Sequence, residues 1–128
     1  MSNALRRMGA PAAALLLLAL AGCATGTPAA LDLPPSCGEY TLGQGESIPD
    51  EAVDCMAAAG EAGATLTVTS PTTEGDPILT VYTAMPDGSV EVYADMTEDR
   101  FGGGISVQIC PEAVSVLDLG GCEEEPVD

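Results

Sequence analysis

Hydrophobic and polar residues alternate with a period of two along three stretches in the middle of the chain, at residues 64–70, 78–85 and 89–96. A fourth apolar stretch follows at residues 105–110. A period of two is typical of β-strands, because successive side chains point to opposite faces of a sheet. We therefore predict a mainly antiparallel sheet of about four strands.

The sequence Pro86-Asp87-Gly88 separates the second and third of these stretches and is typical of a tight turn. Pro presets the backbone angle of a type I turn, and Gly supplies the positive φ that follows it. We expect Met85 to face Ser89 across this turn. The same register then pairs Ala84 with Val90, Tyr82 with Val92, Thr80 with Ala94 and Ile78 with Met96.

This register divides the side chains of the hairpin between two faces. The paired residues just named form a nearly all-apolar face, which we expect to cover a helix. The opposite face carries a mixed set of side chains: Leu79, Val81, Thr83, Glu91, Tyr93 and Asp95.

The predicted helix spans residues 48–59, where apolar residues recur at helical spacing. Its apolar stripe consists of Ile48, Ala52, Cys55, Met56 and Ala59. We expect Ser47 to cap its start, Pro49 to occupy its first turn and Gly60 to end it. A helix this short is marginal on its own, so it must pack against the sheet.

The start of the chain has the composition of a secretory signal. Arg6 and Arg7 precede an apolar run from about residue 10 to residue 20, and small residues follow. At about 1.5 Å per residue, this run reaches only about half of a hydrocarbon core of about 30 Å. Pro11 also lies within the run, so a transmembrane helix is the weaker interpretation.

The tetrapeptide Leu20-Ala21-Gly22-Cys23 ends this apolar run and resembles the lipidation motif of bacterial lipoproteins. The resemblance covers residues 1–23 only. It implies that signal peptidase II cuts between Gly22 and Cys23, and that the Cys23 sulfur carries a diacylglyceryl group. The protein would then be lipid-anchored to the outer, extracytoplasmic face of the cell membrane, because two or three acyl chains bind a bilayer firmly.

The rest of the chain is similar to small uncharacterised lipoproteins of high-GC Gram-positive bacteria. That similarity concerns the composition, the Cys37-Gly38 start and the order of a helix followed by strands, and it implies no function or site residue. We divide the chain into a signal peptide at residues 1–22, a lipidated tether at 23–36, one domain at 37–122 and an acidic tail at 123–128. The domain is too short for two cores.

The cysteines form an even set once Cys23 is assigned to lipid. The four others are Cys37, Cys55, Cys110 and Cys122. Outside the cytoplasm, such a set predicts structural disulfides. The spacing contains no C-x-x-C pair, which argues against a metal site. Four cysteines allow three connectivities, of which we expect the local one, Cys37 with Cys55 and Cys110 with Cys122.

Composition excludes several classes of function. Without residues 1–22, Arg100 is the one cationic side chain against 20 acidic residues, so the net charge is −19. This charge argues against nucleic-acid binding and repels anionic lipid headgroups. The same part of the chain has no His and no Lys, so it cannot build an imidazole-based triad, a Schiff base or a His-ligated zinc site. We predict no catalytic residue, metal or cofactor.

The sequence therefore predicts a small disulfide-stapled α+β domain that serves as a non-enzymatic binding or envelope-interaction module. The candidate interaction face consists of Leu79, Val81, Glu91, Tyr93 and Asp95. Its acids favour a basic protein partner. Two alternatives remain open at this point. One is a calcium-dependent surface protein using the acids near residues 95–99 or 123–125. The other is a hydrolase with two carboxylates about 5 to 10 Å apart.

Overall fold

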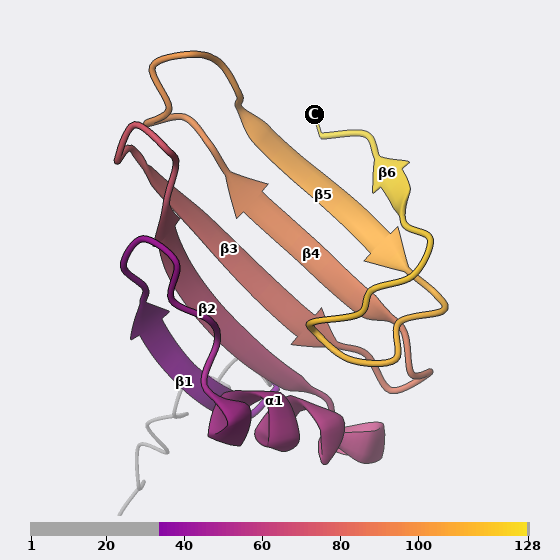
Figure 1. Cartoon of the computed structure of the whole chain (residues 1–128). Coiled ribbons are helices and arrows are strands. Elements are labelled where there is room, and N and C mark those ends of the chain that lie inside the picture. The colour runs from indigo at the N-terminus through magenta and orange to yellow at the C-terminus, as the bar shows by residue number, and fades with distance from the viewer. Residues whose placement is uncertain (1–33, 128) are drawn as a thin grey trace, which may run out of the picture. The chain divides into compact units, whose positions relative to one another are not determined.

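The computed structural model describes residues 34–127, which form one six-stranded sheet with its strands in chain order (Figure 1). The elements are β1 (Ser36–Thr41), α1 (Asp50–Ala57), the 3₁₀ turn η1 (Gly60–Ala62), β2 (Ala64–Pro71), β3 (Pro77–Ala84), β4 (Val90–Asp95), β5 (Ile105–Cys110) and β6 (Glu123–Glu125). The predicted signal sequence and Cys23 lie outside the described residues. Within residues 34–127, no helix has the length and apolar character needed to cross a membrane.

The predicted α+β class is confirmed, but the predicted count of about four strands is wrong, because the sheet has six. β1 begins at Ser36, the last residue of the predicted tether, and has one buried side chain, Cys37. β6 consists of three exposed glutamates that we assigned to the acidic tail. Neither strand has a hydrophobic pattern of its own, since pairing with a neighbouring strand supplies most of its stability.

β1 and β2 are parallel neighbours, whereas every other neighbouring pair in the sheet is antiparallel. A parallel pair needs a crossover connection, and residues 42–63 with α1 supply it. The helix therefore lies over the β1–β2 edge of the sheet (Figure 1).

α1 falls inside the predicted range, but Ser47 is not its cap. Pro49 occupies the N-cap position with φ −59° and ψ 142°, and no side chain caps the helix. Because the Pro ring holds φ near this value, the chain turns into the helix at Pro49 itself. The Pro49 carbonyl accepts hydrogen bonds from the N–H groups of Ala52 and Val53, at 3.0 and 3.2 Å. Gly60 has φ 54° and begins η1 rather than ending α1 directly.

The β3–β4 hairpin has the predicted register. The Met85 N–H donates to the Ser89 carbonyl at 2.9 Å, and Ala84 pairs with Val90 and Tyr82 with Val92. Gly88 has φ 91°, a value that favours glycine. The turn is strengthened by Asp87, whose Oδ1 accepts hydrogen bonds from the N–H and the hydroxyl of Ser89 at 2.9 and 2.6 Å.

Two apolar clusters cover one face of the sheet. In the first, Ala52 and Met56 of α1 pack with Leu66 and Val68 of β2. In the second, the core residues are Val90, Val92 and Cys110, and the residues packed on them include Ala113, Leu119 and Cys122. Tyr82 contacts both clusters. The expectation that this face covers the helix thus holds for the β1–β3 side, while residues 111–122 cover β4 and β5.

The two disulfides are Cys37–Cys55 and Cys110–Cys122, the local pairing that the sequence favours. The first joins β1 to α1. The second joins the end of β5 to the residue before β6. Each bond therefore fixes one of the two elements that cover the sheet.

An ion pair joins the two loops at the other end of the hairpin. Arg100 in the β4–β5 loop donates from Nε to Asp76 Oδ2 at 2.9 Å and from Nη2 to Asp76 Oδ1 at 2.7 Å, and its backbone N–H also reaches Oδ2 at 3.3 Å. Asp76 follows the β2–β3 turn and is buried. The side-chain hydrogen bonds from Arg100 hold the pKa of Asp76 below its ordinary value near 3.8.

Replacing Cys110 and Cys122 by alanine should lower the free energy of unfolding by about 3 kcal/mol, the chain-entropy value for a separation of 12 residues. Urea unfolding followed by circular dichroism measures this loss. Alanine adds no bulk at either position, but removing the buried Cys110 sulfur also leaves a small cavity, so the loss should be at least this large. A variant as stable as the parent protein would show that the bond does not hold residues 111–122 on the sheet.

The contribution of the Arg100–Asp76 pair to the free energy of unfolding should vary with pH. A depressed carboxyl pKa stabilises the fold at neutral pH, and this stabilisation disappears as pH falls through the folded-state value. Arg100→Gln should therefore be less stable than the parent at pH 7, and the difference should shrink on acidification below about pH 4.

Urea unfolding at a series of pH values checks this expectation. Arg100→Lys is the matched control, because it keeps the charge but loses the two-pronged geometry, and it should fall between the other two proteins. If Arg100→Gln and the parent differed in stability by the same amount at acidic and neutral pH, the Arg100 side chain would not be what lowers the pKa of Asp76.

Candidate functional site

The predicted interaction residues lie together on the face of the sheet opposite to the two apolar clusters. Leu79 pairs with Asp95, Val81 with Tyr93, and Thr83 with Glu91, so all of them share one face of β3 and β4. We call this surface the outer face. α1 and residues 111–122 both pack on the other face. Within residues 34–127, neither of these covering elements packs on the outer face.

β5 extends the outer face with three apolar residues that the sequence analysis missed. Ile105, Val107 and Ile109 stand directly opposite Asp95, Tyr93 and Glu91. The alternation of these residues is visible in the sequence, but their register is set across the loop at 97–104, which has no turn rule comparable to that of Pro86-Asp87-Gly88. Leu79 is 36% and Ile105 44% exposed, so the apolar side chains reach the surface.

The resulting outer face has an apolar strip across β3, β4 and β5. The strip consists of Leu79, Val81, Tyr93, Ile105, Val107 and Ile109. On β2, Thr65, Thr67 and Thr69 continue the same face as a row of hydroxyls. On β6, Glu123 and Glu125 stand opposite Ile109 and Val107 and place carboxylates at its border.

Electrostatically, the outer face is acidic. Glu91 and Asp95 lie on β4 itself, and Glu39 adds a carboxylate on β1. Among residues 34–127, Arg100 is the only Lys or Arg, and it forms the bidentate pair with Asp76. The acids of the outer face therefore lack a cationic neighbour from this part of the chain.

Two further carboxyl groups have shifted acidities. The pKa of Asp87 is lowered chiefly by the hydrogen bond from the Ser89 hydroxyl, and that of Asp95 by the bond from the Thr97 hydroxyl. Together with Asp76, these groups stay ionised at neutral pH. A general acid needs the opposite shift, so these three carboxyls are unsuited to donate a proton. The described residues also contain no group of three or more His, Cys, Asp or Glu side chains placed to hold a metal ion.

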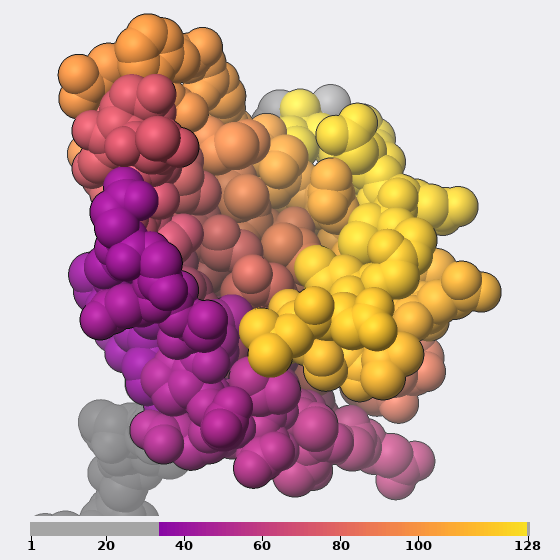
Figure 2. Space-filling model, in the orientation of Figure 1, coloured from indigo at the N-terminus to yellow at the C-terminus, as the bar shows by residue number. Residues whose placement is uncertain are grey.

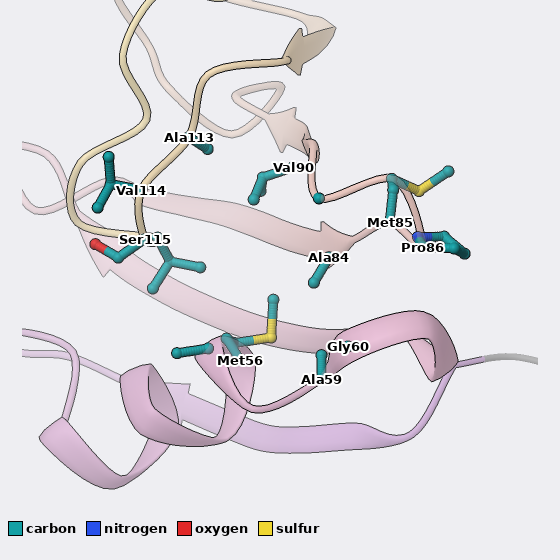
Figure 3. Close-up of a pocket in the computed structure, with 13 residues that line it drawn as sticks. Met56, Ala59, Gly60, Ala84, Met85, Pro86, Val90, Ala113, Val114 and Ser115 are labelled. Carbon is teal, nitrogen blue, oxygen red and sulfur yellow. The ribbon is translucent and has the colours of Figure 1, made fainter.

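A second surface feature lies on the covered side of the sheet. Figure 2 shows this side, with the middle of the sheet recessed between the N-terminal and C-terminal parts of the described chain. A pocket of about 220 Å³ lies where α1, the β3–β4 turn and residues 113–116 meet (Figure 3). Figure 3 shows Met56 extending from α1 toward β3 and β4. No residue of this pocket belongs to the interaction face predicted from the sequence.

The two features differ in chemistry. The outer face is broad, open and bordered by carboxylates, which suits a protein surface with positive charge. The pocket is small and its lining side chains are apolar except for Ser115, which suits one mainly apolar chemical group. No family model, no curated protein and no solved structure matches the chain.

Proposed function

We propose that this protein is a membrane-anchored extracytoplasmic lipoprotein whose folded domain is a non-enzymatic binding module for a basic protein of the cell envelope. The observation that carries the proposal is the outer face, an apolar strip bordered by carboxylates on a sheet whose other face forms the core. The tetrapeptide ending at Cys23 supports the anchoring.

The apolar strip provides the driving force for binding. Burying Leu79, Val81 and Tyr93 against a partner removes apolar surface from water. The strip belongs to three paired strands, so its backbone loses little conformational freedom on binding. Exposed contiguous apolar surface with a polar border is typical of protein interaction sites.

The carboxylates supply selectivity for a basic partner. Glu91 and Asp95 stand in register with apolar strip residues, and both lie within the same strand as Tyr93. Their charge attracts cationic side chains and speeds association, and salt screens the attraction. The net charge of −19 outside residues 1–22 acts in the same direction at longer range.

The anchoring proposal assigns the segments of the chain. Residues 1–22 are removed, Cys23 carries the lipid, and the tether runs to the start of β1 at Ser36. A single sulfur atom therefore decides where the protein is located. Because the tether is short, it would keep the domain close to the extracytoplasmic face of the cell membrane.

Cys23→Ser should abolish acylation while leaving the melting temperature of the domain unchanged. Metabolic labelling with an alkynyl fatty acid measures the first effect, and thermal unfolding followed by circular dichroism measures the second. Cys23 lies outside the two disulfides, so oxidative folding should proceed normally. Continued labelling of the variant would show that another residue carries the lipid.

Binding should require the centre of the outer face. A Tyr93→Ala, Glu91→Lys double variant removes an aromatic side chain from the strip and reverses an adjacent charge. Cross-linking on intact cells, followed by mass spectrometry, should capture a basic envelope protein with the parent chain and lose it with this variant. High salt should weaken capture by the parent, because the carboxylates steer the encounter.

A matched control makes the same types of change on the covered side. Glu51→Lys on α1 with Leu117→Ala reverses one charge and removes one exposed apolar side chain, since Leu117 is 60% exposed. This control should retain the partner. Equal capture by both double variants, or capture that does not respond to salt, would overturn the assignment of the outer face.

A further inference from the structure

The pocket on the covered side has an unusual lining for so acidic a domain. Its walls come from Met, Ala, Val, Pro and Gly residues, with Ser115 as the one polar side chain and no charged residue. Burying a charged or strongly polar group in such surroundings is unfavourable. The lining therefore selects an uncharged apolar group.

The size of the pocket limits what can enter. Its volume is about 220 Å³. A methylene group needs about the same space as a water molecule, about 30 Å³, so the pocket accommodates about seven carbon atoms of an alkyl chain. Met56 and Met85 lie in its walls, and their unbranched side chains adapt to flexible apolar ligands. Pro86 and Val114 are exposed at its edge, so the rest of a longer chain can continue outside.

The pocket lies at the end of the domain where the chain enters from the tether. A Cβ atom on Gly63 would lie 3.5 Å from Pro34 Cβ and 2.7 Å from the carbonyl oxygen of Ala84, which itself lines the pocket. Pro34 lies eleven positions after Cys23 in the sequence. Fully extended, this stretch spans at most about 40 Å. A lipid on Cys23 would therefore keep the pocket end of the domain within this distance of the bilayer.

We propose that this pocket binds the end of an alkyl chain from an uncharged lipid of the membrane that anchors the protein. The membrane as the source of the lipid rests on the proposed lipidation of Cys23, whereas the affinity of the pocket for an alkyl chain does not. The short tether brings the pocket close to a high local concentration of such chains.

The surroundings of the pocket exclude anionic lipids. Asp87, Glu61 and Glu112 are sequence neighbours of lining residues, and all three are exposed. Carboxylates this close in sequence to the lining disfavour a phosphate or carboxylate headgroup beside the pocket. A glycerolipid with an uncharged head meets no such repulsion.

Photo-cross-linking tests the proposal. The lipidated protein is placed in phosphatidylcholine nanodiscs that contain a monoacylglycerol with a diazirine near the end of its acyl chain. After irradiation and reduction, the glutamyl endopeptidase Glu-C separates the three methionines of the mature chain into peptides 52–61, 75–91 and 92–98. The peptides of Met56 and Met85 should be labelled about fivefold more than that of Met96, which does not line the pocket.

Two variants close the pocket by different means. Ser115→Asp puts a charge in its wall, and the new carboxylate can still accept the hydrogen bonds that Ser115 Oγ accepts from the N–H groups of Leu117 and Asp118. Ala113→Leu fills its space. Each should lower labelling of the Met56 peptide about fivefold or more. Leu117→Asp is the matched control on the same segment, because Leu117 does not line the pocket, and it should be labelled like the parent.

The mature chain (residues 23–128) with Cys23→Ser, irradiated with the same probe free in solution, separates the pocket from the anchor. Labelling of the Met56 and Met85 peptides there supports the pocket even if the nanodisc protein proves not to be lipidated. Equal labelling of all three peptides in solution, or labelling that neither pocket variant reduces, would overturn the proposal. Neither result bears on the basic partner of the outer face, which is captured separately.

Discussion

The small size of the buried core is the constraint on which the rest of the structure depends. α1 has eight residues and buries two of them, Ala52 and Met56, so it covers the β1–β2 side of the sheet and little more. Residues 111–122 must cover β4 and β5, although they contain no helix or long strand. Cys37–Cys55 and Cys110–Cys122 fix these two covering elements in place. In so small a domain, the cross-links compensate for a limited core.

Local sequence rules explain which parts of the fold could be predicted from the sequence. α1 and the β3–β4 hairpin have local rules, namely helical spacing and a Pro86-Asp87-Gly88 turn, and both were predicted. β1 and β6 have no such rule, because their places depend on neighbours distant in sequence. Predicting Ser47 as the cap failed for a different reason. The helix begins two residues later than expected, after Pro49, whose fixed φ suits the N-cap position, so Ser47 lies two residues before the N-cap.

The candidate sites show the same difference between local and long-range contacts. The register of one hairpin was sufficient to bring Leu79, Val81 and Tyr93 together with two acids. The contribution of β5 to the outer face could not be derived, because the loop at 97–104 that precedes β5 follows no turn rule that would set its register. The pocket was beyond prediction as well. Its walls come from three separate segments, and single Ala and Met residues in such segments look the same whether they line a cavity or fill a core.

The excess of acidic side chains affects both the outer face and the pocket. Because Arg100 is paired with Asp76, the acids of residues 34–127 have no other Lys or Arg in that part of the chain to neutralise them. Glutamates on β6 and Glu39 on β1 also lie on the two edge strands, where charged side chains discourage pairing with further strands. Association by a sheet edge is thereby disfavoured. The open outer face and the uncharged pocket are two surfaces of residues 34–127 at which burial of apolar groups can still drive binding, and we propose a cationic protein for the first and a neutral alkyl chain for the second.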